Sequence, residues 1–137
     1  MIFASIFFFV LSFGLLECID IKVAAPYEEG GDEPCLRLCT GTTGKGSTPW
    51  KYYSTDGIYV KVDMTNCDFK PGLTPIVTSV LAGESHLWVT TGGSEIYSLT
   101  SSSFVNYVHM RAEYGNIHSF YKADKWRIDW QAIGYAC

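Results

Sequence analysis

This chain has no excess of basic residues and no basic cluster. It carries 10 lysines and arginines against 14 acidic residues, for a formal net charge of -4. A protein that binds nucleic acid through its phosphates needs a basic patch or stripe. The charge balance therefore excludes nucleic acid as an expected partner.

The sequence also lacks the short motifs of common catalytic and metal sites. It has no Gly-x-Ser-x-Gly element for a nucleophilic serine. Its 3 histidines are not spaced as metal ligands within one element, and nothing singles out a carboxylate pair for glycoside hydrolysis. We therefore expect a protein that is not an enzyme and that uses neither a cofactor nor a metal ion.

Long apolar runs are scarce, and the clearest one lies at the N-terminus. Residues 1–16 are almost purely apolar, and charged sequence begins at Glu17. The run is shorter than the ~20 residues that span a bilayer, and its position is typical of a secretory signal peptide. Cleavage after Cys18, which makes residues 1–18 the signal, or after Gly14 satisfies the small-residue requirement. An uncleaved anchor and lipidation are the alternatives.

Secretion changes the meaning of the cysteines. Cys18 would leave with the signal, and Cys35, Cys39, Cys67 and Cys137 would remain. Four cysteines in an oxidising compartment predict two disulfides. Of the three possible connectivities, we favour those that join Cys35 and Cys39 to distant partners, because a bridge across three residues is often strained. A zinc site is disfavoured, since Cys-x3-Cys is loose for a metal knuckle and no second close pair exists.

The chain is long enough for one domain after the signal. Residues 19–49 form a polar, Gly- and Thr-rich segment that we expect to be loop, and residues 50–137 form the folded domain. Within that domain, β-branched and aromatic residues alternate with polar ones. Strands are expected over residues 57–64, 74–81, 87–91, 94–99, 104–110 and 126–133, with a helical turn near 119–125.

This pattern predicts an all-β fold, an antiparallel β-sandwich of about six strands stapled by disulfides. The alternation assigns the following residues to its core: Ile58, Val60, Val62, Ile76, Val80, Phe104, Val108, Ile128 and Trp130. Asn106 also falls on the inward face. It therefore needs a buried hydrogen-bond partner, or a bulge must shift the register there.

The aromatic content exceeds what one small core can hold, with 4 tryptophans and 9 tyrosines. Some rings must be exposed, either as cover for the sandwich and its rim or as a contact surface. Flat aromatic faces stack on sugar rings, and neighbouring polar side chains orient the sugar hydroxyls. The aromatics therefore favour a glycan or protein contact surface over a catalytic site.

Three segments resemble the H-type lectin domain, a six-stranded antiparallel sandwich found in secreted invertebrate agglutinins. They are residues 69–80, 97–108 and 128–133, which match its Phe…Pro-x-Val, Tyr…Phe and Ile-x-Trp-x-x-Ile strands. The resemblance implies sugar contacts in strand-end loops and across subunit interfaces. It also implies a histidine just before the last strand, matched here by His118. Residues 88–97 separately resemble secreted skeletal matrix proteins of corals and other invertebrates.

Two functions follow as expectations. The first is a secreted, extracellular matrix structural or interaction protein, which contacts matrix proteins or mineral through the acidic cluster of residues 28–33. The alternative is a lectin that binds glycans through the loop of residues 114–125 and forms homo-oligomers, since a single shallow sugar site binds weakly. Neither function involves a membrane after signal cleavage. The candidate ligand-binding residues are His118, Tyr121, Tyr114, Arg127 and Asp129.

Overall fold

A computed structural model of the chain describes residues 17–22, 35–91 and 95–136. These residues form eight strands and four short 3₁₀ helices. The strands are β1 (Glu17–Lys22), β2 (Cys35–Thr42), β3 (Lys51–Tyr52), β4 (Gly57–Asp63), β5 (Ile76–Ala82), β6 (Glu95–Tyr97), β7 (Ser103–His109) and β8 (Arg127–Tyr135). The helices are η1 (Thr65–Cys67), η2 (Leu87–Val89), η3 (Ala112–Tyr114) and η4 (Ile117–Ser119).

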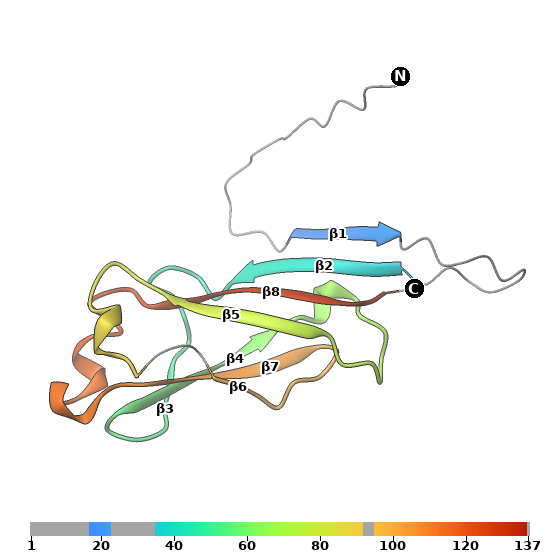
Figure 1. Cartoon of the computed structure of the whole chain (residues 1–137). Coiled ribbons are helices and arrows are strands. Elements are labelled where there is room, and N and C mark those ends of the chain that lie inside the picture. Colours follow the sequence, from blue (N-terminus) through green and yellow to red (C-terminus); the bar gives the residue numbers. More distant parts are fainter. Residues whose placement is uncertain (1–16, 23–34, 92–94, 137) are drawn as a thin grey trace, which may run out of the picture.

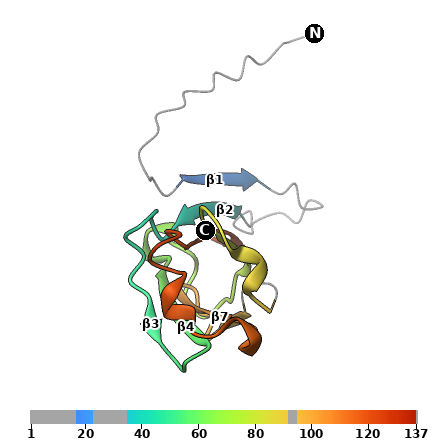
Figure 2. The same cartoon turned by 90° about the vertical axis from the view of Figure 1, so that its left-hand side faces the viewer.

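The strands make two antiparallel sheets that face each other across one core. One sheet has the order β1-β2-β8-β5 and the other has the order β3-β4-β7-β6. Figure 1 shows them as two layers, and Figure 2 views the sandwich from one end. The expected all-β sandwich is confirmed, with more strands than the sequence pattern indicates.

The additional strands include two in the segment that we expected to be loop. β1 pairs with β2, and β2 pairs with β8 from Leu36 to Thr42, so the loop expected over residues 35–48 is wrong for residues 35–42 and holds for residues 43–48. Gly41 explains the error. A Cβ atom at Gly41 would lie 2.5 Å from Cζ2 of Trp130. The glycine therefore serves close packing inside a strand, whereas its sequence context suggests a turn.

The strand expected over residues 87–91 is also wrong. These residues begin with the 3₁₀ helix η2, which follows His86 in the left-handed region with φ 58°. The segment reaches the β4–β7 sheet through single hydrogen bonds, from Arg111 N–H to the Val89 carbonyl at 3.0 Å and from Thr91 N–H to the His109 carbonyl at 2.9 Å. The helical turn expected near residues 119–125 begins earlier, as η4.

The expected core is confirmed except in β5. Ile58, Val60, Val62, Phe104, Val108, Ile128 and Trp130 are buried. Ile76 and Val80, in contrast, are 74% and 58% exposed, so their assignment to the core is wrong. β5 carries apolar residues on both faces, and it turns Val77, Ser79 and Leu81 toward the core instead.

Asn106 has the buried partner that its position requires. Its side chain is fully buried, and its Nδ2 donates a hydrogen bond to Oγ of Ser79 at 2.8 Å. Its Oδ1 has no hydrogen-bond partner among the described residues. The Asn106–Ser79 bond joins β7 to β5 across the core, and so fixes which face of β5 points inward.

A disulfide joins Cys39 of β2 to Cys67 of η1, which confirms a long-range pairing for Cys39. Cys35 is also disulfide-bonded, whereas Cys137 lies outside the described residues. Cys18 is a free, exposed thiol opposite Cys39 in the β1–β2 pair. Of the expected signal, residues 1–18, the first sixteen lie outside the described part and the last two begin β1; the acidic cluster of residues 28–33 also lies outside it. No helix within that part is long and apolar enough to cross a membrane.

Replacing Trp130 tests the core. Trp130 is buried and packs edge-on against Phe104, with 6.0 Å between ring centroids. We expect Trp130→Ala to lower the free energy of unfolding by about 3–5 kcal/mol in denaturant titrations. Tyr135→Ala removes an exposed ring from the same strand and should change it by less than about 1 kcal/mol. Equal effects of the two substitutions would contradict the assigned strand faces.

Candidate functional site

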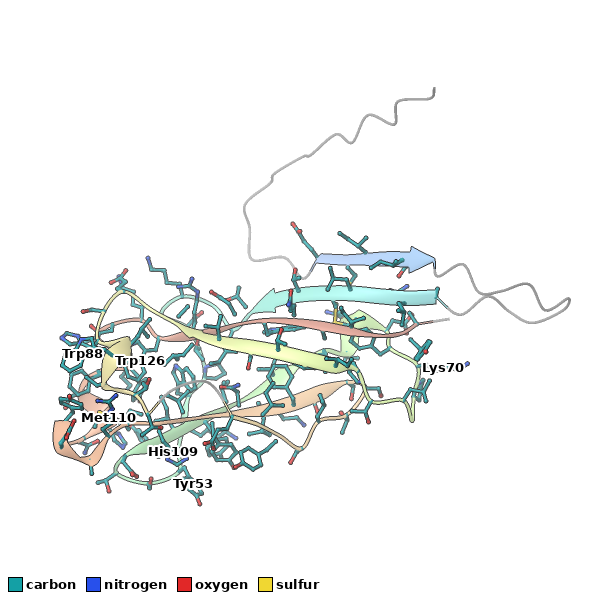
Figure 3. The ribbon with its side chains drawn as sticks, in the orientation of Figure 1. Tyr53, Lys70, Trp88, His109, Met110 and Trp126 are labelled. Carbon is teal, nitrogen blue, oxygen red and sulfur yellow. A yellow bond between two sulfur atoms is a disulfide. The ribbon has the colours of Figure 1, made fainter. Side chains whose placement is uncertain are left out.

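Three loops gather at one end of the sandwich. They comprise residues 43–50, 83–91 and 111–126, and this end faces the viewer in Figure 2. Figure 3 places the side chains of Trp88 and Trp126 there, whereas Lys70 lies at the opposite end.

Trp126 connects the three loops. Its buried indole N–H donates to the Ser85 carbonyl at 3.0 Å, and its own carbonyl accepts the indole N–H of Trp50 at 2.9 Å. Its backbone N–H donates to the Tyr121 carbonyl at 3.0 Å. Gly83 leaves room for the indole, because a Cβ atom there would lie 2.6 Å from Cδ1 of Trp126.

Three polar pairs brace the same end. Oε1 of Glu84 lies 3.0 Å from Nζ of both Lys45 and Lys125, which links all three loops. The hydrogen bonds from Lys125 and then Lys45 lower the pKa of the Glu84 carboxyl. Nδ1 of His86 lies 2.9 Å from Oδ2 of the buried Asp124.

A hollow of about 530 Å³ opens between the loops of residues 43–50 and 111–126, beside β3. This volume falls within the range of small-molecule clefts, about 300–1,000 Å³. Its lining consists of Gly46, Ser47, Thr48, Pro49, Trp50, Tyr52, Tyr121, Lys122 and Trp126. The lining is therefore rich in aromatic rings and hydroxyl groups, and Lys122 is its one charged residue.

Tyr52 and Tyr121 line this hollow, and the ring of His118 contacts both of them from outside the lining. The rings of Tyr52 and His118 lie 3.5 Å apart between centroids, at an interplanar angle of 35°. The hydroxyl groups of Tyr52 and Tyr121 share a hydrogen bond of 2.9 Å. Nζ of Lys122 lies 5.8 Å from the centroid of the Tyr121 ring. Tyr52 is exposed and Tyr121 is only 6% exposed, so Tyr121 positions the ring that solvent or a ligand can reach.

Burial, followed by the hydrogen bond and charge of Tyr52, raises the pKa of Tyr121 to about 12. The neutral phenol is the stable form in this environment because ionisation would place a charge in a desolvated position. The Tyr121 hydroxyl is therefore a fixed hydrogen-bonding group at any physiological pH.

A spectroscopic titration tests this environment. One of the 9 tyrosines should ionise late, near pH 12, in the tyrosinate absorbance of the folded protein, and Tyr121→Phe should remove that late step. The unfolded pKa is about 10. A raised folded pKa therefore contributes stability that is full below pH ~10 and is lost as the pH rises through the folded pKa. An unchanged titration curve in Tyr121→Phe would contradict the assignment.

The structure brings together only two of the five expected binding residues, His118 and Tyr121. Tyr114 instead packs edge-on against Trp88, with 5.0 Å between ring centroids. Arg127 and Asp129 pair with each other through two hydrogen bonds of 3.0 Å. They lie on the outer face of β8, and neither residue belongs to the lining of the hollow.

Sequence reasoning missed Tyr52 and Trp50 as parts of this site. Tyr52 lies 69 positions from Tyr121 in the sequence, on a strand of only two residues. The nearest available signal was the surplus of aromatic residues, which indicates exposed rings without placing them.

Within the described part of the chain, one cluster has donor atoms spaced as metal ligands. The Sγ atoms of Cys18, Cys39 and Cys67 all lie within 4.8 Å of one another. Cys39 and Cys67 are joined as a disulfide, however, and a metal needs thiolates. The cluster is therefore a disulfide with a free thiol beside it, and it does not offer a set of metal ligands.

Comparison of the chain with protein-family models, curated proteins and solved structures finds no match. The functional argument therefore rests on the geometry of this chain.

Proposed function

We propose that this protein is a secreted, non-enzymatic extracellular matrix protein that binds glycans through the hollow at the end of its sandwich. The exposed ring of Tyr52, which lines that hollow and contacts the half-buried ring of His118, carries the proposal. The disulfide supports a location outside the cytosol, and the apolar N-terminal run supports secretion.

The surroundings of the pair suit a sugar ring. An aromatic face contacts the apolar C–H face of a pyranose, while hydroxyl groups fix its orientation. Ser47 and Thr48 supply hydroxyls beside Trp50, and Lys122 supplies a positive charge. This lysine favours a sugar that carries a carboxylate or sulfate.

Pre-organisation also supports binding at this point. The Tyr52 ring is held by its hydrogen bond to Tyr121 and by its contact with His118. A ring that is already fixed loses little conformational entropy when a ligand binds. An open hollow of this kind still gives modest affinity, and repeated glycans in a matrix would raise the effective strength.

A glycan array tests the proposal. The wild-type protein should bind acidic glycans in a saturable manner, and Tyr52→Ala should weaken this binding about tenfold, ~1.4 kcal/mol, because the accessible ring is removed. Lys122→Gln should reduce the preference for acidic over neutral sugars. Tyr135→Ala, which removes an exposed ring from the outer face of the other sheet, is the matched control. Undiminished binding by Tyr52→Ala would refute a site in this hollow.

A structural role is the second candidate, and a different surface favours it. Ile19, Leu38, Ile133 and Ile76 occupy one row across the outer face of the β1-β2-β8-β5 sheet. Ile19 and Ile76 are exposed. A contiguous apolar patch on a protein surface marks a contact site, and a flat sheet face packs well on a second copy of itself.

Sedimentation measurements test this second role. We expect the wild-type protein to self-associate and Ile76→Lys to dissociate it, because a charge would be buried in the contact. Lys51→Glu, an exposed substitution on a strand of the opposite sheet, is the control. A wild-type protein that stays monomeric at all concentrations would eliminate the role of this face in self-association.

A further inference from the structure

The outer face of the β3-β4-β7-β6 sheet carries a second group of aromatic residues, which is unusual for a face exposed to solvent. The solvent face of an antiparallel sheet usually presents polar residues. Here Tyr107 contacts Tyr53, Tyr59 and Tyr97, with ring centroids 5.4, 5.3 and 5.1 Å away. We call Tyr53, Tyr59, Tyr97 and Tyr107 the tyrosine face.

Strand register places these rings on one surface. Tyr107 lies directly between Tyr59 of β4 and Glu95 of β6. The preceding residue, Asn106, points into the core. Because side chains alternate between the two faces of a strand, residues 95, 97, 105 and 107 point outward. The tyrosine face is therefore imposed by the same pleat that builds the core.

A glycine allows Tyr53 to join this face from the turn after β3. A Cβ atom at Gly57 would lie 3.2 Å from both Cδ1 of Tyr53 and Cε1 of His109. The Tyr53 ring stands edge-on to the His109 ring, with 5.9 Å between centroids. Figure 3 shows both residues on the side of the sandwich turned away from β1 and β2.

The rings enclose a hollow instead of lying flat on the sheet. Tyr53 and Tyr97 stand at 87° and 77° to the Tyr107 ring. Together with Glu95, Ser98 and His109 they line a hollow of about 300 Å³. Tyr97 is 52% exposed, so much of its ring area is open to a ligand.

The polar lining of this hollow includes one negatively charged residue, Glu95. The Tyr97 hydroxyl donates to Oε2 of Glu95 at 3.3 Å, and the Glu95 carboxylate raises the pKa of Tyr97. Glu95 is the one carboxylate in the lining, and neither lysine nor arginine contributes to it. The carboxylate accepts hydrogen bonds from ligand hydroxyls and repels anionic groups.

We propose that the tyrosine face is a second binding site, which takes an uncharged pyranose oligosaccharide. Its rings contact the C–H faces of successive sugars, and Glu95 accepts hydrogen bonds from their hydroxyls. The site stands independently of the hollow at the end of the sandwich. That hollow carries Lys122 as its one charged residue, so the two sites differ in the sign of their charge and in the glycans they select.

Calorimetric titrations of the full secreted chain test the proposal. The neutral probes are cellohexaose and chitohexaose, and the anionic probe is a hyaluronan hexasaccharide. We expect at least one neutral probe to bind, and Tyr97→Ala to weaken that binding about tenfold. Tyr135→Ala removes an exposed ring elsewhere and should leave it unchanged. If the proposal for the end hollow is wrong, Tyr52→Ala will bind the hyaluronan probe as tightly as the wild type does. That result does not depend on the neutral probes, so the two proposals fail separately.

A second variant keeps the test valid if Tyr97→Ala perturbs the fold. Glu95→Gln retains every ring and removes the charge, so it should weaken the neutral probe severalfold and reduce discrimination against hyaluronan. Chemical-shift changes at the His109 imidazole should accompany binding in both the wild type and this variant. Absence of binding by both neutral probes, wild-type affinity in Tyr97→Ala, or a preference of this face for hyaluronan would overturn the proposal.

Discussion

The buried indole of Trp126 is the constraint on which the end of the sandwich depends. An indole N–H taken out of water needs an acceptor, and here that acceptor is a loop carbonyl, of Ser85. The Trp126 carbonyl in turn accepts from Trp50, which belongs to a second loop. The hydrogen bonds of one residue therefore set the relative positions of loops that are distant in sequence. The hollow beside it is a consequence of that anchoring.

The sequence predicts strands best where each strand has one apolar face. In β4 and β8, every second residue from Ile58 and from Ile128 is buried, and the assigned faces are those that the structure shows. β5 has apolar residues at both parities, so alternation alone cannot orient it. The Asn106–Ser79 hydrogen bond orients β5, and a pairing 27 positions apart leaves no local pattern. The strand at Gly41 was not predicted for a related reason, because the role of this glycine depends on the distant Trp130 ring.

The candidate site was predictable only to the extent that it is local. His118 and Tyr121 are close in sequence and meet in the structure, whereas Tyr52 reaches them from β3, 69 positions away from Tyr121. Arg127 and Asp129 look like a polar binding pair in the sequence. Two residues apart on a strand, however, they share one face and satisfy each other. Aromatic surplus in a sequence thus indicates that exposed rings exist, while their grouping is decided by long-range strand pairing.

The free thiol of Cys18 would give the position of the proposed signal cleavage a chemical consequence. Its sulfur lies within 4.8 Å of both sulfurs of the Cys39–Cys67 disulfide, and a thiolate at that position is a nucleophile for thiol–disulfide exchange. Burial raises the pKa of the Cys18 thiol, which keeps it mostly protonated. Cleavage after Gly14 would leave this nucleophile and the whole of β1 in place. Cleavage after Cys18 would remove both the nucleophile and the start of the strand, and the crosslink would then be permanent with respect to its own chain.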